Sequence, residues 1–376
     1  MKTTMIRLLK ILALFLAVLL FLSFMQNYVF AYIDQNSERV HSFYLEEKNS
    51  LDVVFMGASD VNTAFAPGLA YEKFGFTSYL YAFDANPGSL YKYQLKEIRS
   101  TQNPQAIVIE INGFLYPNDY QASEARLRLF VENIPFSLNK LQAVFNYDVE
   151  DKVSYLFPLV KYHGDWIKGG KLAEAYQWPT THGTKPALWK GVTACTLTRP
   201  VEPSVAQIHT PTDPEANAIA ETQLIDFLEF CKKENITNLI FTRFPHRNYV
   251  AHIAKVARAE EILNQYGYTL WNMEGKLDEI GLDINADFYD DEHVNIYGQE
   301  KMTEYIGAYL ASEWIKTPIT QSEKNAKHWD ACVAAYKPFN DYARYMTEAG
   351  IERWAAEEPY ELGFYYEWLE KGYLIP

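Results

Sequence analysis

Short apolar runs alternate with stretches of helical spacing over much of the chain, and this alternation predicts the fold. The predicted strands are Leu51–Met56, Thr77–Phe83, Ala106–Ile111, Asn238–Thr242 and Tyr268–Met273. The third run is nearly continuous in apolar residues, which indicates a strand buried on both faces. Strands that alternate with helices form parallel sheets with helices on both faces, so we expect an α/β fold.

Helical spacing of apolar residues fills the intervals between these strands. A proline in the first turn favours a helix over Pro67–Phe74, and we expect Ser89 to cap a helix over Ser89–Ser100. Three further predicted helices are Asp213–Glu234, Tyr249–Tyr266 and Ile296–Trp314.

The alternation stops after the third strand and resumes only in the second half of the chain. We interpret the stretch between, about 114–212, as a helical insertion at one edge of the sheet, within an α/β domain over 51–315. Residues 316–376 follow as a helical extension that is acidic and rich in Trp and Tyr. The helices predicted in the insertion are Gln121–Asn133, Ser137–Phe145 and Val149–Tyr162.

The N-terminal residues predict the compartment. Basic residues lie on the N-terminal side of Ile11–Met25, a run without charge that approaches, with its flanks, the roughly 20 residues that span a bilayer. This charge bias keeps the N-terminal end in the cytoplasm. Because no small-residue cleavage site follows Met25, we predict an uncleaved signal anchor over 1–32, with a cleaved signal peptide as the alternative. A stalk or amphipathic helix over 33–50 would then carry a globular part outside the cytoplasmic membrane.

Charge and cysteine content exclude several classes of protein. The 376 residues carry a net charge of -14. An acidic surface argues against nucleic acid, which binds basic faces, and against a globular part lying flat on anionic lipid. The cysteines are odd in number and far apart, and they form neither a disulfide framework nor a zinc pattern. The sequence implies no metal and no diffusible cofactor.

Two short motifs carry candidate chemistry. Ser59 follows the first strand in a Gly-Ala-Ser turn, where a hydroxyl can be reached from the edge of a sheet. Asp290 and His293 lie three residues apart before the last helix of the α/β unit, a spacing that lets a carboxylate orient an imidazole. The alternatives are a helix cap for Ser59 and a solvated acidic loop for the other two.

Together, the turn GAS and the segment DEHVNIYG resemble the SGNH (GDSL-like) hydrolase superfamily. The resemblance implies a three-layer α/β/α, flavodoxin-like sheet, with Ser59 as nucleophile, His293 as base and Asp290 as the group that orients it. The first motif departs from the family, because Ala58 precedes the serine and Asp60 follows it.

The resemblance also implies an oxyanion hole built from three donors. These would be the Ser59 N–H, Gly88 in the turn ANPGSL, and Asn112 in the segment VIEINGF. Glu110 stands where the family usually has a glycine, which departs from the pattern beside Asn112.

The anchor and the helical insertion are similar to a membrane-anchored branch of this superfamily, which includes D-alanine transfer proteins and proteins of envelope polysaccharide O-acylation. That branch implies an acyltransferase or esterase that acts on acetyl or D-alanyl esters of a cell-envelope polymer, such as a teichoic acid. A membrane-bound O-acyltransferase would be its partner. The alternative is a catalytically inactive SGNH-like adaptor that docks with such an enzyme.

Three more residues are candidates for substrate binding. Arg243 and Arg247 follow the fourth strand, at the sheet edge where open α/β folds bind ligands. They could hold a phosphate or carboxylate of a polymer, and the alternative is a loop ion pair. His246 between them is expected to be exposed. His163 in the insertion could line a substrate groove, and the alternative is an ordinary core or surface histidine.

Overall fold

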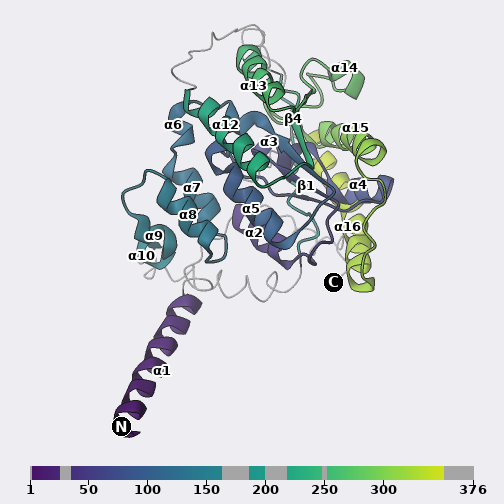
Figure 1. Ribbon diagram of the computed structural model, residues 1–376. Helices are drawn as coiled ribbons and strands as arrows, with labels where there is room; N and C mark the ends of the chain where they lie inside the picture. The colour runs from purple at the N-terminus through teal and green to yellow at the C-terminus, as the bar shows by residue number, and fades with distance from the viewer. Residues whose placement is uncertain (1, 26–34, 163–185, 200–217, 248–251, 351–376) are drawn as a thin grey trace.

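The computed structural model describes residues 2–25, 35–162, 186–199, 218–247 and 252–350 (Figure 1). Its described part contains a five-stranded, all-parallel sheet in the order β2-β1-β3-β4-β5. Flavodoxin-like doubly wound sheets have this order. Every strand overlaps its predicted range, so the expectation of a parallel α/β sheet is confirmed. The strands are β1 Val53–Met56, β2 Ser78–Leu80, β3 Ala106–Glu110, β4 Leu239–Arg243 and β5 Leu270–Asn272.

Alternate residues of the strands supply two separate hydrophobic cores, one on each face of the sheet. In β1, Val54 and Met56 join one core, whereas Val53 and Phe55 join the other. This division follows from the two-residue period of a strand. It also explains why the strand sequences are apolar throughout, since a parallel sheet covered on both sides has no polar face.

The first core is covered by helices that lie to the left of the strands in Figure 1. Its apolar side chains come mainly from α2 (Gln35–Leu45), α5 (Tyr91–Thr101), α12 (Ala218–Lys233) and α13 (Ile253–Gln265). The insertion extends this layer, because α8 packs on α5 and α6 packs on α12. Its described helices are α6 Asn118–Gln121, α7 Glu124–Val131, α8 Leu138–Asn146, α9 Lys152–Leu156 and α10 Pro158–Tyr162.

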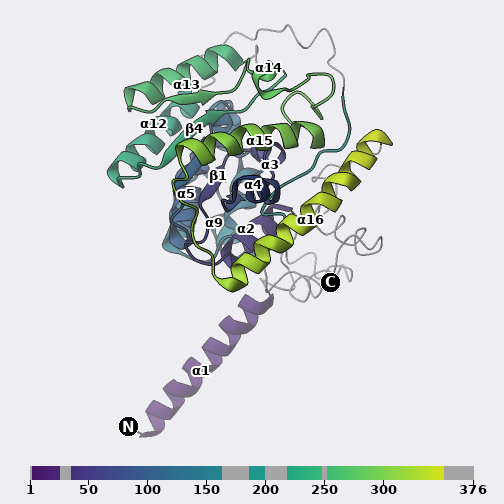
Figure 2. The same cartoon turned by 90° about the vertical axis from the view of Figure 1, so that its right-hand side faces the viewer.

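The second core is covered by helices that come early and late in the chain (Figure 2). These are α3 (Ser59–Ala64), α4 (Pro67–Phe74), α15 (Ile296–Glu313) and α16 (Glu323–Glu348). Contacts of α15 with both α3 and α4 bring the start of the α/β unit against its end. The short helix α14 (Leu277–Ile280) packs on α15 at the periphery.

The expected helix capped by Ser89 is wrong in detail. A 3-10 turn, η2 (Gly88–Leu90), precedes α5, and Leu90 is the residue at the N-cap. The Ser89 hydroxyl instead donates to the backbone oxygen of Gln121, 2.8 Å away. Its bond therefore ties the start of α5 to the insertion.

The segment expected to be a stalk or an amphipathic helix forms the helix α2, which begins the globular core. Val40 and Phe43 of α2 are fully buried. Arg39 donates to the backbone oxygens of Ala82 and Gly191 at 3.0 and 3.1 Å, so its charge is satisfied inside the protein. Because α2 packs against the first core, the domain starts near residue 35 and not at 51.

The start of the C-terminal extension is also part of the core. Trp329 of α16 is fully buried and stacks on Tyr71 of α4, with 5.0 Å between the ring centroids. Phe339 stacks on Trp189 at 4.9 Å. Trp329 belongs to the first core and Phe339 to the second, so the helix packs against both cores. Residues 351–376 lie outside the described residues.

One helix in the described part of the chain is long and apolar enough to cross a membrane. This is α1 (Lys2–Phe24), in which Thr4–Phe24 has a mean hydropathy of 2.6 and is exposed to its surroundings. Both membrane anchors and signal sequences have such helices.

Candidate active site

Ser59 lies at the carboxyl end of β1, where a sharp turn leads into α3. A Cβ atom on Gly57 would lie 2.4 Å from Val61 Cγ2 and 2.9 Å from the Cβ of Glu110, so only glycine fits this turn. Ala58 occupies the N-cap position of α3. Ser59 is therefore not the helix cap, and its hydroxyl points instead toward His293. The neighbours β2 and β3 are reached by connections on opposite faces, and ligands bind at such a switch point in open α/β sheets.

The side chains of Ser59, His293 and Asp290 form a continuous chain of short contacts. Ser59 Oγ lies 2.8 Å from His293 Nε2. His293 Nδ1 lies 2.9 Å from both Oδ1 and Oδ2 of Asp290. With the Nδ1 proton directed at the carboxylate, Nε2 is left to accept the hydroxyl proton of the serine. The two sequence motifs are thus brought together in the order hydroxyl, imidazole and carboxylate.

A compact loop before α15 holds the histidine in place. Phe288 and Val294 form an antiparallel bridge across the loop. The backbone N–H groups of Glu292 and His293 both donate to Asp290 Oδ1 at 2.8 Å. Asn295 closes the loop, because its side chain accepts from two N–H groups at the start of α15. These bonds hold the side chains of His293 and Asp290 in their observed rotamers.

The described end of the insertion contacts both α3, which begins with Ser59, and the loop that carries His293. Its Thr193 N–H donates to the backbone oxygen of Asn62 in α3, 2.8 Å away. Further along, Asn295 Nδ2 donates to the backbone oxygen of Leu197 at 3.1 Å. The segment 193–199 therefore links the serine helix to the histidine loop.

The pKa of His293 is raised by its partner. Burial alone would lower it, but the hydrogen bond and negative charge of Asp290 outweigh burial. Burial likewise acts to raise the pKa of Asp290, yet its bonds to His293 and the two N–H groups hold it below its usual value. The site therefore favours an imidazolium next to a carboxylate, the charge state that forms when serine loses its proton.

A second buried histidine lies beside Asp60, the residue that follows the serine. His246 Nε2 is 3.6 Å from Asp60 Oδ2, and its Nδ1 is 3.5 Å from Glu274 Oε1. The expectation that His246 is exposed is wrong, because it is only 1% exposed. Burial and Arg243 lower the pKa of His246, but Asp60 and Glu274 outweigh them and raise it to about 9. Asp60, the residue after the serine, thus faces a buried histidine at ion-pair distance.

Arg243 belongs to this network and does not face a substrate. Its Nε lies 2.7 Å from Glu274 Oε1 and its Nη1 lies 3.3 Å from Glu110 Oε1. Only 1% of its surface is exposed. Burial and the charge of Asp60 raise the pKa of Glu110, while Arg243 and His246 oppose that shift. The role expected for Arg243 in holding a polymer does not fit this position, since its donors serve buried carboxylates.

Arg247 supports the histidine loop from outside. Its Nη2 lies 3.1 Å from Asp291 Oδ1, and its backbone N–H donates to the backbone oxygen of Asp291 at 2.9 Å. Its Nη1 donates to the backbone oxygen of Arg199. The loop ion pair, and not substrate binding, accounts for these contacts. His163 lies outside the described residues.

The oxyanion-hole candidates have different surroundings. A Cβ on Gly88 would lie 2.2 Å from Phe114 Cδ1, so packing alone requires glycine there. The Asn112 N–H donates to Glu110 Oε2 at 2.6 Å, which leaves the Asn112 side chain as the group available for an oxyanion. Its Nδ2 lies 3.4 Å from Tyr116 Oη. Glu110, unusual for the resembled family, is thus held by Arg243 and by the turn that carries Asn112.

Sequence reasoning missed the network of Asp60, Glu110, Arg243, His246 and Glu274. Two signals could have found it: a glutamate ends the apolar strand β3, and the segment RFPHR directly follows β4. Charges at the ends of adjacent buried strands need partners nearby. In the described part of the chain, no cluster of His, Cys, Asp and Glu could hold a metal ion.

The architecture is an α/β fold with a five-stranded parallel sheet. The likeness to SGNH hydrolases rests on the Gly57–Ser59 and Asp290–His293 motifs, and so does the function that it implies. Neither a protein-family model nor a curated protein matches the sequence.

Proposed function

We propose that this protein is a membrane-anchored, extracytoplasmic serine acyltransferase or esterase of the SGNH type. The single observation that supports it most is the chain of contacts from Ser59 through His293 to Asp290. A serine hydroxyl, an imidazole and a carboxylate in this order are the parts of a nucleophilic triad.

The proposed reaction transfers an acyl group through the serine. Ser59 Oγ attacks the ester carbonyl while His293 Nε2 takes the hydroxyl proton, and Asp290 stabilises the imidazolium. The tetrahedral intermediate collapses, and His293 returns the proton to the departing alcohol. An acyl-Ser59 ester remains. A hydroxyl of an envelope polymer, or water in the esterase case, then attacks this ester with His293 again as base.

The negative oxygen of the intermediate needs donors. The proposal assigns this role to the Ser59 N–H, the Gly88 N–H and the side-chain amide of Asn112. Loss of one such donor commonly costs about 100- to 1000-fold in rate. The position of Asn112 just after β3, the strand beside β1, supports its inclusion.

The substrate and partner follow from the family resemblance. The acyl group would be acetyl or D-alanyl, the acceptor a cell-envelope polymer, and the partner a membrane-bound O-acyltransferase. The apolar helix α1 supports a location at the membrane. The buried start of α2 also supports it, since few residues would separate such an anchor from the catalytic domain.

The proposal is tested by ester turnover of the full chain in lipid nanodiscs, with p-nitrophenyl acetate as substrate. Ser59→Ala should abolish turnover above the spontaneous rate, whereas the matched control Ser312→Ala, at the exposed end of α15, should keep it. Turnover that survives in Ser59→Ala contradicts the proposal. A wild-type protein without turnover favours the alternative, an inactive adaptor, for which the occupied Asn112 N–H is the supporting observation.

A further inference from the structure

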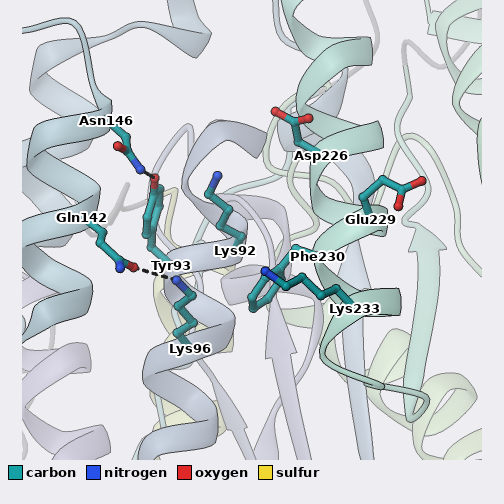
Figure 3. A pocket seen from close by; sticks show the side chains of 9 residues that line it. All are labelled: Lys92, Tyr93, Lys96, Gln142, Asn146, Asp226, Glu229, Phe230 and Lys233. Carbon is teal, nitrogen blue, oxygen red and sulfur yellow. Dashed lines mark hydrogen bonds between the residues drawn. The ribbon is translucent and has the colours of Figure 1, made fainter.

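A lysine-lined groove lies between α5, α8 and α12, on the face of the sheet that carries the first core. Figure 3 shows its lining side chains, and its volume is about 820 Å³. A groove of this size can hold a small organic molecule such as a sugar. None of the triad residues lines it.

Three ammonium groups converge on this groove. Lys92 and Lys96 both lie over the ring of Tyr93, at 5.1 and 5.7 Å from its centroid. Lys96 also lies 5.4 Å from the ring centroid of Phe230. Figure 3 shows the side chain of Lys233 reaching across Phe230 from α12 toward the same place. Two aromatic faces therefore form the floor under a cluster of positive charge.

These lysines are not paired with carboxylates. Within the described ranges, no Asp or Glu lies at ion-pair distance from Lys92, Lys96 or Lys233. The protein has 48 acidic residues against 34 basic ones, so such pairing would be easy to provide. Partial burial and the neighbouring charge of Lys92 lower the pKa of Lys96. Carboxylates therefore lie near the cluster, Glu234 among them, but none forms a direct ion pair with these three lysines.

Amide groups line the wall opposite α12. Lys96 Nζ donates to Gln142 Oε1 at 2.9 Å, and Asn146 Nδ2 donates to Tyr93 Oη at 2.9 Å. At the other rim, Asp226 projects from α12, whereas the carboxylate of Glu229 accepts from Tyr266 Oη at 2.7 Å and points away from the lysines. Amides and carboxylates together match the hydroxyl groups of a sugar or polyol, which both donate and accept hydrogen bonds.

We propose that this groove binds an anionic sugar, in which a phosphate or carboxylate group contacts Lys92, Lys96 and Lys233 while the hydroxyl groups face the amides and the acidic rim. The rim carboxylates disfavour ligands with many charges, so a sugar with one anionic group fits the groove best. The inference is independent of the catalytic proposal, since it uses none of the same residues.

Calorimetric titration of the full chain tests the proposal, with glucose 1-phosphate, glucuronate and neutral glucose as separate probes at low salt. We expect saturable binding of at least one anionic sugar and none of glucose, and the stronger anionic probe identifies the group that is recognised. Lys96→Gln should weaken that binding about tenfold, the equivalent of about 1.4 kcal/mol. Asp226→Asn should strengthen it, because a like charge at the rim is removed.

Lys232→Gln is the matched control, because Lys232 precedes Lys233 in α12 but does not line the groove. It should leave affinity unchanged. Absence of binding by both anionic probes, or equal affinity in Lys96→Gln and Lys232→Gln, overturns the proposal. Ester turnover in Lys96→Gln should equal that of the wild type, so failure of the groove and failure of the proposed triad are measured separately.

Discussion

Ser59 Oγ and His293 Nε2 lie 2.8 Å apart although 234 residues separate them in the chain. They meet because the first strand of the α/β unit and its last helix share one edge of the fold. Ser59 begins α3, His293 precedes α15, and α15 packs directly on α3. The order and packing of these elements therefore create the contact. The proposed chemistry depends on it.

Replacement of Asp290 by Asn should change both the rate and the pH dependence of ester turnover. The serine is activated only by neutral His293, and Asp290 raises the pKa of that histidine. In the wild type, the apparent pKa on the acid side of the kcat/KM profile should thus lie above the ordinary histidine value of about 6.5. In Asp290→Asn it should move to lower pH, and kcat should fall by about 100- to 10,000-fold.

Asp291→Asn provides the control for this profile, since Asp291 pairs with Arg247 and not with His293. Its acid limb should stay where the wild type has it. An equal displacement in both variants, or none in Asp290→Asn, would show that Asp290 does not set the pKa of the base.

Stability should fall as pH rises through the pKa of His246. The folded pKa of about 9 exceeds the unfolded value of about 6.5. The stabilisation is thus fully present below pH 6.5 and is lost as pH rises through 9. The difference corresponds to about 3 kcal/mol. Urea unfolding at pH 6.5 and 9.5 should show this loss, and His246→Gln should show a smaller one. Identical losses in the two proteins would contradict a charged His246.

Arg243→Met should destabilise the fold strongly. Its removal leaves Glu110 buried without a cation at ion-pair distance and Glu274 with His246 as its remaining partner. Breaking a buried ion pair in this way costs about 3–5 kcal/mol. Arg258→Met is the comparison, because its pairs with Glu221 and Glu261 are exposed and should contribute less than about 1 kcal/mol. Similar unfolding midpoints for the two variants would argue against a structural role for Arg243.

Trp329→Ala should cost about 3–5 kcal/mol, the usual range for a buried large aromatic side chain. The side chain is fully buried against Tyr71. Tyr345 of the same helix is 58% exposed, so Tyr345→Ala should change the unfolding free energy little. A small effect of Trp329→Ala on the free energy of unfolding in urea would contradict a place for α16 in the core.

The sheet could be predicted from sequence because each strand is a local apolar run bounded by turns. Ala106–Ile111 became β3 almost unchanged, and Pro67–Phe74 became α4 with the same bounds. Segments whose burial depends on distant partners could not be predicted in this way. The polar helix α2 looks like a stalk until Arg39 meets the backbone of Gly191, 152 residues away.

The candidate site shows the same limit. The spacing of Asp290 and His293 is local, so their pairing could be expected from the sequence. Whether Arg243 faces a polymer or a buried glutamate depends on the strand order, which places β4 beside β3 and brings its end to Glu110. Both roles suit an arginine at a strand end, and only the packing distinguishes them.

The central claim is that His293 activates Ser59 as a nucleophile, and covalent labelling tests it most directly. A fluorophosphonate forms a phosphorus–oxygen bond with an activated serine and releases fluoride. The account predicts one adduct, on the peptide that contains Ser59, formed by the wild-type protein and lost in His293→Ala. Absence of an adduct on Ser59, or an equal labelling rate in His293→Ala, would contradict it.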